Sequence, residues 1–352
     1  MSLDGPLKEL QRFLCKSCSR SFTLGRKTAR PRARFADDVV LEAVRLYVQG
    51  LASHRVLSNL LEQRIGRPVS RFTLNTWVDE IGAHAKTPLQ TSMELAPRWG
   101  GFLGVDGKAI SVAGKRHCLF IGVDYPTQDI VHAFACEKEE GEEFARLVIE
   151  ARLDAGHFTN GLVTDYGKGF QTAHVDNFPG IPWQLCRVHL DRHLDTSLPQ
   201  LKRSELAPLQ AELKARIRAI LHADSYDQAA RLWYQLSDDR KRFANCHWNR
   251  GSNSLLHLQG HFNLYMTHHM VKGLPPDTNF VENVIKQLGK KLRLMEGFAT
   301  LESADRFCRL LVGCYRFKRF TGSRNGTNGK APLQVAGVDL KGRDWLTFLL
   351  DS

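Results

Sequence analysis

A series of short apolar segments constrains the fold of this 352-residue chain more than any other feature. Aliphatic and aromatic runs bounded by Gly, Pro and Asp are typical of strands, and apolar residues three or four positions apart are typical of helices. By these patterns the chain is expected to form three strands, a helix, a strand, a helix and a strand, at residues 101–112, 117–125, 129–139, 140–156, 161–165, 166–178 and 181–189.

That order of elements predicts an α/β core with a mixed five-stranded sheet flanked by helices, as in the ribonuclease H-like fold. Pro199, Pro208 and the turn "NRGSN" interrupt a mostly helical stretch that follows, and we expect this stretch to be an inserted helical domain. The predicted parts are a basic arm (1–36), a helix-turn-helix region (37–97), the first part of the core (98–189), the helical insertion (190–275), the last part of the core (276–321), and a linker with a C-terminal tail (322–352).

The basic arm carries nine Lys and Arg side chains against Asp4 and Glu9, and the whole chain has a formal net charge of +12. A surplus of this size favours a polyanionic partner, and nucleic acid fits best because no lipid anchor or basic amphipathic segment is visible. The alternative is that the arm is a solubilising tail. With no run of 18 apolar residues and no signal peptide, we expect a cytoplasmic protein that does not bind membranes.

Cys15 and Cys18 form a C-x-x-C within the arm, a spacing that lets two thiolates reach one Zn²⁺ ion. Zinc needs four ligands, and no second C-x-x-C accompanies this one. A zinc site and a metal-free remnant of a zinc ribbon are therefore both open.

Residues 37–84 contain three helical segments separated by turns with Gly, and Ser53 and Ser70 are expected to cap the second and third of them. Three short helices with this spacing suit a helix-turn-helix unit whose last helix enters the DNA groove. A small helical bundle without a role in DNA binding is the alternative.

Two carboxylates follow apolar strand segments, Asp106 in "FLGVD" and Asp165 in "GLVTD". Two-metal phosphoryl transfer needs acidic side chains from separate elements that converge on one spot, and Mg²⁺ prefers oxygen ligands. Asp124, in the similar phrase "LFIGVDYP", competes with Asp106. If Asp124 were the ligand, the strand that carries Asp106 would be surplus to the fold, so we expect Asp124 to begin a turn instead.

Glu282 is the expected third carboxylate, on the amphipathic helix that follows the insertion. At about 100° per residue it falls beside the apolar stripe of this helix together with Lys286 and Arg293, where Glu282 can reach a metal while the basic residues, including Lys290, approach phosphates. The alternatives are a surface ion pair between Glu282 and Lys286, and Glu296 as the working carboxylate.

Cys186 and His189 form "CRVH" at the end of the predicted fifth strand. A structural Cys beside a hydrogen-bonded His is the ordinary explanation for such a pair. Its place next to the predicted carboxylates also makes His189 a candidate phosphate or DNA contact.

These motifs together resemble the DDE transposases of the Mutator-like group and their bacterial insertion-sequence relatives. The resemblance rests on "GVDGK" with Asp106, "LVTDYGKGF" with Asp165, "CRVH", the helical insertion, and "TNFVENVIKQLGKKLR" with Glu282, in this order and with a long spacing before the final Glu. It covers about residues 98–320, and the C-x-x-C and helix-turn-helix segments also resemble that group's DNA-binding region. The departure lies at the N-terminus, where half of the zinc ribbon is absent.

The resemblance implies a metal-dependent transposase. In that group's pattern Asp106, Asp165 and Glu282 hold two Mg²⁺ ions, for which Mn²⁺ can substitute, Cys186 with His189 is the C-x-x-H signature near the active site, and Asn279 assists in "TNFVE". The implied partners are DNA at the element ends and target DNA, and the implied assembly is a homodimer or larger synaptic complex in the cytoplasm, associated with the nucleoid. Two alternatives stay open: a catalytically silent DNA-binding protein derived from such an enzyme, and a different ribonuclease H-like nuclease.

Overall fold

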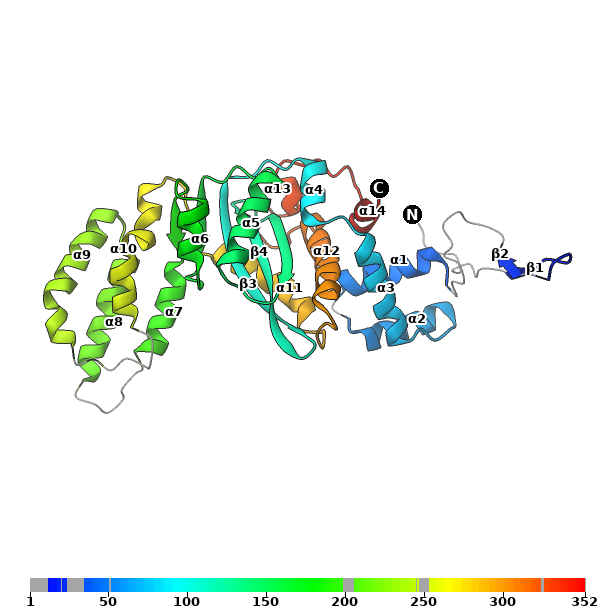
Figure 1. Ribbon diagram of the computed structural model, residues 1–352, viewed down its shortest axis with the longest axis horizontal. Helices are drawn as coiled ribbons and strands as arrows, with labels where there is room; N and C mark the ends of the chain where they lie inside the picture. Colours follow the sequence, from blue (N-terminus) through cyan, green and yellow to red (C-terminus); the bar gives the residue numbers. More distant parts are fainter. Residues whose placement is uncertain are drawn as a thin grey trace.

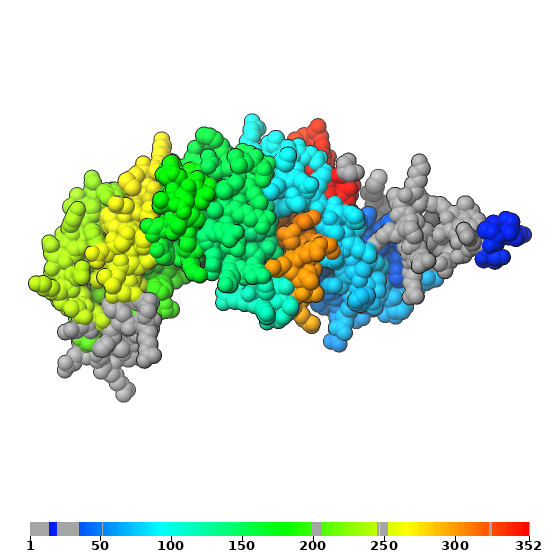
Figure 2. All heavy atoms as spheres, viewed as in Figure 1, coloured from blue at the N-terminus to red at the C-terminus, as the bar shows by residue number. Residues whose placement is uncertain are grey.

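The structure of the protein, a computed structural model, describes residues 12–19, 21–23, 35–50, 52–198, 206–244, 246, 253–323 and 326–351. Most of the predicted basic arm, Pro199 and most of the "NRGSN" turn lie outside these ranges. The sheet and its covering helices occupy the middle of an elongated molecule, with the helices of residues 187–270 at one end and those of residues 37–84 at the other (Figure 1). Figure 2 shows the same succession on the surface.

Five strands form one mixed sheet in the order β5-β4-β3-β6-β7. Within this sheet, the first three strands in sequence order are antiparallel neighbours: β3 (Phe102–Val112), β4 (Lys115–Tyr125) and β5 (Ile130–Cys136). The last two add on in parallel, β6 (Gly161–Thr164) and β7 (Trp183–Leu185). The predicted order of strands and helices is confirmed, but β7 is much shorter than residues 181–189, because a helix begins directly after it.

Helices cover both faces of this sheet. α5 (Gly141–Leu153) and α6 (Phe170–Asn177) share a hydrophobic cluster with Leu103 and Val105, whereas α11 (Asn279–Leu292) and α12 (Leu301–Phe317) share another with Ile121. Side chains alternate along a strand, so Gly104 points to the opposite face from Leu103 and lies under α11. A Cβ at Gly104 would come within 2.5 Å of Val281, so this glycine lets the helix approach β3 closely.

The three predicted N-terminal helices are present as α1 (Asp37–Gln49), α2 (His54–Ile65) and α3 (Arg71–His84). Both predicted caps are confirmed, because the Ser53 and Ser70 hydroxyls accept backbone N–H hydrogen bonds three residues further on. α4 (Pro88–Leu95) connects these helices to the sheet. The buried residues of α1–α3 belong to the same hydrophobic cluster as α12, so this region packs directly on the sheet-covering layer.

The stretch expected as a helical insertion is helical where the structure describes it. It contains α7 (Arg187–Ser197), α8 (Ala207–Leu221), α9 (Tyr226–Asp238), a 3-10 turn (η1, Asp239–Phe243) and α10 (Ser254–Met270). The expected linker and tail carry α13 (Pro332–Val335) and α14 (Trp345–Leu350). Trp345 and Leu346 are buried in the cluster of α12, so this segment contributes to the core. Within the described residues no helix is both long enough and apolar enough to cross a membrane.

A fully buried ion pair joins α12 to the sheet. Nε and Nη2 of Arg316 each donate to one carboxylate oxygen of Asp129 at 2.8 Å, and both side chains are completely shielded from solvent. Arg316 also donates to the carbonyl of Pro88 at 3.0 Å, and the indole of Trp99 donates to Asp129 at 3.0 Å. The pair therefore ties α12, α4 and the turn between β4 and β5 together.

A buried lysine connects α11 to the N-terminal helices. The ammonium of Lys291 donates to the carbonyl of Ala52 at 2.8 Å and lies 3.3 Å from the centroid of the Tyr47 ring. Only 3% of Lys291 is exposed, and this burial lowers its pKa to about 7.

Replacing this lysine is expected to flatten the pH dependence of stability. Between pH 7 and pH 10 the unfolded chain keeps the Lys291 proton that the folded chain loses, so the wild-type free energy of unfolding rises with pH, by about 1.4 kcal/mol for each unit between the two pKa values. Lys291→Met removes this contribution. Chemical unfolding of both proteins at several pH values in this window measures it, with the exposed neighbour Lys290→Met as the matched control. A difference between wild type and Lys291→Met that stays constant with pH contradicts the assignment.

Candidate active site

Asp106 and Asp165 lie side by side on the sheet. Val105 of β3 pairs with Thr164, the last residue of β6, and the two strands are parallel, so the next residue of each is an aspartate at the same level. Asp106 accepts a hydrogen bond from the N–H of Gly107 at 2.8 Å. β3 continues to Val112, so Asp106 lies within its strand and does not end it. The structure thus brings together the two aspartates that the sequence analysis expected at one edge; their role stays a prediction.

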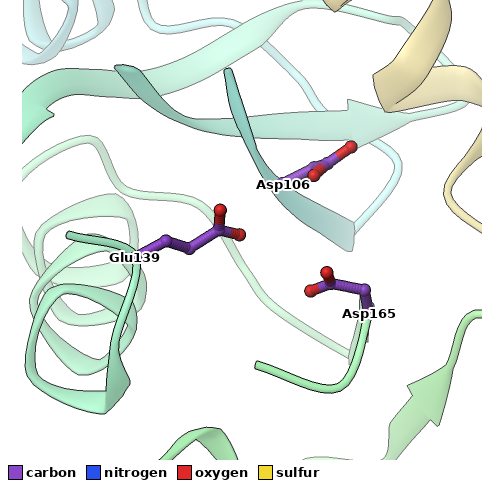
Figure 3. A group of neighbouring side chains, drawn as sticks. All are labelled: Asp106, Glu139 and Asp165. Atoms are coloured by element: carbon purple, nitrogen blue, oxygen red, sulfur yellow. The ribbon is translucent and has the colours of Figure 1, made fainter. Parts of the chain in front are cut away.

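A third carboxylate, Glu139, joins these two. It lies in the short segment between β5 and α5, and one ligand atom from each of Asp106, Glu139 and Asp165 lies within 4.8 Å of the others. Figure 3 shows the three carboxylates pointing into a shared space from three separate parts of the chain. We call these three residues the carboxylate group.

Glu139 reaches this space because Gly107 has no side chain. A Cβ on Gly107 would lie 2.1 Å from Oε2 of Glu139 and 2.6 Å from the sulfur of Cys118. The Glu139 carboxylate therefore occupies the volume that any larger residue at position 107 would fill.

Filling that volume is expected to disturb the carboxylate group. Gly107→Ala places a methyl group where Oε2 of Glu139 lies, so the Glu139 side chain must move away. We expect this variant to bind Mn²⁺ at least about tenfold more weakly than the wild type, since displacing residues around a metal costs about that much. Isothermal titration with Mn²⁺ measures the change. Gly180→Ala, at a position with open space around it and no left-handed backbone, is the control for a glycine substitution. Equal affinity in Gly107→Ala and the wild type would contradict the expected displacement.

Burial and mutual repulsion raise the pKa values within the carboxylate group. Burial, followed by the charge of Asp165, raises the pKa of Asp106 to about 7. Burial, followed by the charges of the two aspartates, raises the pKa of Glu139 to about 8, and burial also raises the pKa of Asp165. Oδ1 of Asp165 and Oε1 of Glu139 are buried without a hydrogen-bond partner in the described part of the chain. Three oxygen donors with unused lone pairs fit a hard divalent cation such as Mg²⁺ or Mn²⁺.

Glu282 lies in the first turn of α11, outside the carboxylate group. Both of its oxygens accept hydrogen bonds from Arg192 of α7, at 2.6 and 3.0 Å. Although burial opposes it, these hydrogen bonds hold the pKa of Glu282 below its ordinary value. Nε2 of His189 lies 3.9 Å from Oε1 of Glu282. The alternative of an ion pair between Glu282 and Lys286 is not the contact that the structure gives, because the partner of Glu282 is Arg192.

Cys186 and His189 belong to the start of α7 and not to the end of β7, which corrects the expected position. The backbone N–H and the hydroxyl of Thr278 each approach the sulfur of Cys186 at 3.3 Å, and Thr278 also lies 3.5 Å from Nδ1 of His189. A hydrogen bond with Cys186 and the charges of nearby carboxylates raise the pKa of His189 to about 9, so the imidazole is cationic at neutral pH. Asn279, at the start of α11, donates its backbone N–H to Asp277 at 3.1 Å.

A basic hollow lies between the β3–β4 hairpin and the segment that follows α11, and Lys108 is its lining residue nearest in sequence to Asp106. Its volume is about 360 Å³, and the described residues that line it include no Asp or Glu. Lys108 projects from the same face of β3 as Asp106, two residues further along. The basic lining residues are Lys108, Lys115, Arg116 and Arg293. The exposed Lys286 and Lys290 lie on α11, which ends one residue before Arg293.

The structure also describes the C-x-x-C motif of Cys15 and Cys18, and Asp124, the residue that competed with Asp106 in the sequence. Cys15 and Cys18 lie in the connection between β1 (Arg12–Leu14) and β2 (Ser21–Thr23), and no third ligand accompanies them among the residues that the structure describes. Asp124 lies within β4, one residue before its end, so the turn expected to begin at Asp124 starts after Tyr125. The buried carboxylate of Asp124 accepts hydrogen bonds from the N–H groups of Gly100 and Gly101 and from the Thr127 hydroxyl. Asp124 is thus a structural carboxylate.

The fold and the site together define an α/β protein with a buried group of three carboxylates that could hold a metal ion. The Mutator family of transposases matches residues 21–316, and the chain belongs to this family.

Two curated relatives share a low sequence identity with the chain, over less than half of its length. The chain is 23% identical over 165 residues to the "Transposase for insertion sequence element IS256 in transposon Tn4001" of Staphylococcus aureus and to the protein of the same description from Enterococcus faecalis. Each alignment covers 44% of this chain and 41% of the relative, so the chain matches less than half the length of these proteins.

Proposed function

We propose that the chain is a DDE-type DNA transposase that cleaves phosphodiester bonds at the ends of a mobile element and joins the freed ends to target DNA. The observation that carries the proposal is the placement of Asp106 and Asp165 on adjacent parallel strands in a chain of a transposase family. The strand order β5-β4-β3-β6-β7, with three antiparallel strands followed by two parallel ones, supports a ribonuclease H-like core. Helices α1–α3 support a helix-turn-helix unit for recognising element ends.

In this mechanism Asp106, Asp165 and Glu282 would hold two divalent cations, Mg²⁺ or Mn²⁺. When bound, such cations neutralise phosphate charge and lower the pKa of a water molecule. The aspartates contribute positioning, since both come from strands held in one sheet. Cationic His189 lies where it can donate a hydrogen bond to a phosphate oxygen next to the carboxylates.

The proposed chemistry is two successive displacements at phosphorus. In the first, a water oxygen bonds to phosphorus while the bond between phosphorus and the 3′ oxygen breaks, which leaves a 3′-hydroxyl on the element. In the second, this 3′ oxygen bonds to a phosphorus of target DNA and displaces the target's own 3′ oxygen, which takes up the proton. No oxidant and no covalent protein intermediate is required.

For Glu282 to serve as a ligand, its carboxylate would have to give up the two hydrogen bonds that it accepts from Arg192. Arg192 is more than half exposed, so its guanidinium then becomes available to a DNA phosphate. The basic hollow beside the β3–β4 hairpin offers the DNA backbone further positive charge, and phosphate contacts fix a protein on its substrate. Two element ends must be held together in transposition, so a homodimer or larger synaptic complex on nucleoid DNA stays our expectation.

The experiment that tests the proposal uses the purified full chain, Mg²⁺ or Mn²⁺, and DNA fragments that carry the sequences flanking the gene. We expect metal-dependent strand cleavage at the element boundary and, with a target plasmid, joined products. DNA binding without metal-dependent cleavage would favour a catalytically silent DNA-binding protein. Hydrolysis without any joined product would favour a different nuclease of the same fold.

A further inference from the structure

We propose that Glu139 is a metal ligand, and that Asp106, Glu139 and Asp165 form the cation site of the DNA-free protein before Glu282 takes part. This inference rests on the proposed function, because it assigns a further residue to the same metal centre. It adds a carboxylate from the segment between β5 and α5 to the predicted set of Asp106, Asp165 and Glu282.

The oxygens of the three carboxylates are nearly close enough together to bind one cation. A cation that holds each oxygen at about 2.1 Å places two oxygens up to about 4.2 Å apart, and the carboxylate group already has one oxygen from each member within 4.8 Å of the others. Small side-chain rotations therefore complete the site without movement of the strands. The three side chains come from three separate elements and converge on one space (Figure 3).

Among the described residues, the Glu139 carboxylate has no close hydrogen-bond partner. Its one hydrogen bond within this part of the chain is a long contact of 3.8 Å from the thiol of Cys118 to Oε2. Oε1 of Glu139 is buried without a partner, as is Oδ1 of Asp165. A buried polar atom without a hydrogen-bond partner destabilises the folded protein, and more strongly when it is charged. A shared cation removes this cost for both residues at once.

The sheet leaves room for the Glu139 side chain next to Asp106. Gly107 leaves open the space that the carboxylate fills, beside Asp106 and on the side towards Cys118. A glutamate with no function there would gain by turning outwards to solvent, as the neighbouring Glu137 does. Instead, its side chain points to the two aspartates.

The hydrogen bonds of Glu282 distinguish this inference from a metal site made of Asp106, Asp165 and Glu282 alone. Its oxygens are both occupied by Arg192, so in the DNA-free protein Glu282 has less to offer a cation than Glu139 has. A triad of Asp106, Asp165 and Glu282 alone predicts that metal binding without DNA depends on Glu282. Our inference predicts that it depends on Glu139.

The test is Mn²⁺ binding to the full chain without DNA, followed by the electron paramagnetic resonance signal of free Mn²⁺. Glu139→Gln is compared with Asp106→Asn, Asp165→Asn and Glu282→Gln, and exposed Glu137→Gln is the matched control from the same segment. We expect Glu139→Gln and both aspartate variants to bind at least about tenfold more weakly. Glu282→Gln and Glu137→Gln are expected to stay within about twofold of the wild type.

Thermal unfolding without metal checks that Glu139→Gln folds. The substitution removes one of three crowded carboxylates, so its unfolding temperature is expected to equal or exceed that of the wild type. Gly107→Ala is the second variant, because it keeps the Glu139 carboxylate but displaces it, and it should show the same loss of Mn²⁺ affinity.

The outcomes separate this inference from the proposed function. Wild-type affinity in Glu139→Gln, together with weak binding in Asp106→Asn and Asp165→Asn, overturns the role of Glu139 and leaves the proposed function standing. Loss of binding in Glu282→Gln but not in Glu139→Gln also overturns it, in favour of the simple triad. Wild-type affinity in both aspartate variants overturns the metal centre itself, and with it the proposed function.

Discussion

Asp106→Asn and Asp165→Asn are each expected to reduce metal-dependent DNA cleavage by at least about 10³-fold. Each substitution removes a negative charge and a ligand atom from the proposed metal centre, and the stabilisation of transition-state charge by such centres amounts to several kcal/mol. A loss of about 4 kcal/mol corresponds to this factor, because each 1.36 kcal/mol changes the rate tenfold. Cleavage of end-bearing DNA in Mg²⁺, followed over time on denaturing gels, measures the rates.

DNA binding by both variants is expected to be retained, since neither aspartate is placed to contact the phosphate backbone through a positive charge. Asp176→Asn, on the exposed side of α6, is the control for the loss of one carboxylate elsewhere and should cleave as the wild type does. Undiminished cleavage in either Asp106→Asn or Asp165→Asn would remove that residue from the mechanism.

Asp129→Ala is expected to have the largest effect on stability. It leaves the guanidinium of Arg316 fully buried without its carboxylate, and removing one partner of a buried pair costs about 3–5 kcal/mol. Trp99 loses the acceptor for its indole N–H as well. Urea unfolding followed by circular dichroism measures the change in the free energy of unfolding.

A double variant distinguishes the loss of the ion pair from the loss of packing. Asp129→Leu combined with Arg316→Met replaces both charges with apolar side chains, and such replacements are often close to neutral. We therefore expect the double variant to recover much of the stability that Asp129→Ala loses. A loss below about 1 kcal/mol in Asp129→Ala would show that the pair does not hold α12 to the sheet as described.

The sheet and its order follow from local patterns in the sequence. Strand-length apolar runs, turns rich in Gly and Asp, and the two capping serines are short-range signals, so β3–β6 and α1–α3 lie close to their expected positions. The proximity of Asp106 and Asp165 depends on the topology of the sheet, because β3 and β6 are neighbours in it although β4, β5 and α5 lie between them in the sequence. The end of β7 was harder to predict, since "CRVH" continues an apolar run that in fact turns into α7.

Glu139 was missed for a physical reason. It stands in "CEKEE", where three glutamates have the same local surroundings, and nothing in the segment distinguishes the one that turns inwards. What selects Glu139 is the space left by Gly107 on another strand, which is a tertiary effect. The contact between Arg192 and Glu282 likewise depends on how α7 packs beside α11, and the residues are 90 positions apart.

The packing of the C-terminal segment also depends on contacts between residues far apart in the sequence. Its glycine- and asparagine-rich start predicts a linker, and the short apolar run around Trp345 is too brief to indicate a packed helix by itself. In the fold this run lies against α12, where Gly313 leaves room for Leu349, so the partner that makes α14 part of the core is far away in the sequence.

Anomalous X-ray diffraction from crystals soaked in Mn²⁺ tests the central claim most directly, because it locates the cation itself. The account predicts an anomalous peak within about 2.1 Å, to a tolerance of about 0.2 Å, of one carboxylate oxygen of Asp106 and one of Asp165. The absence of a peak between these two residues at saturating Mn²⁺, in crystals of active protein, would contradict the claim that they form the metal centre.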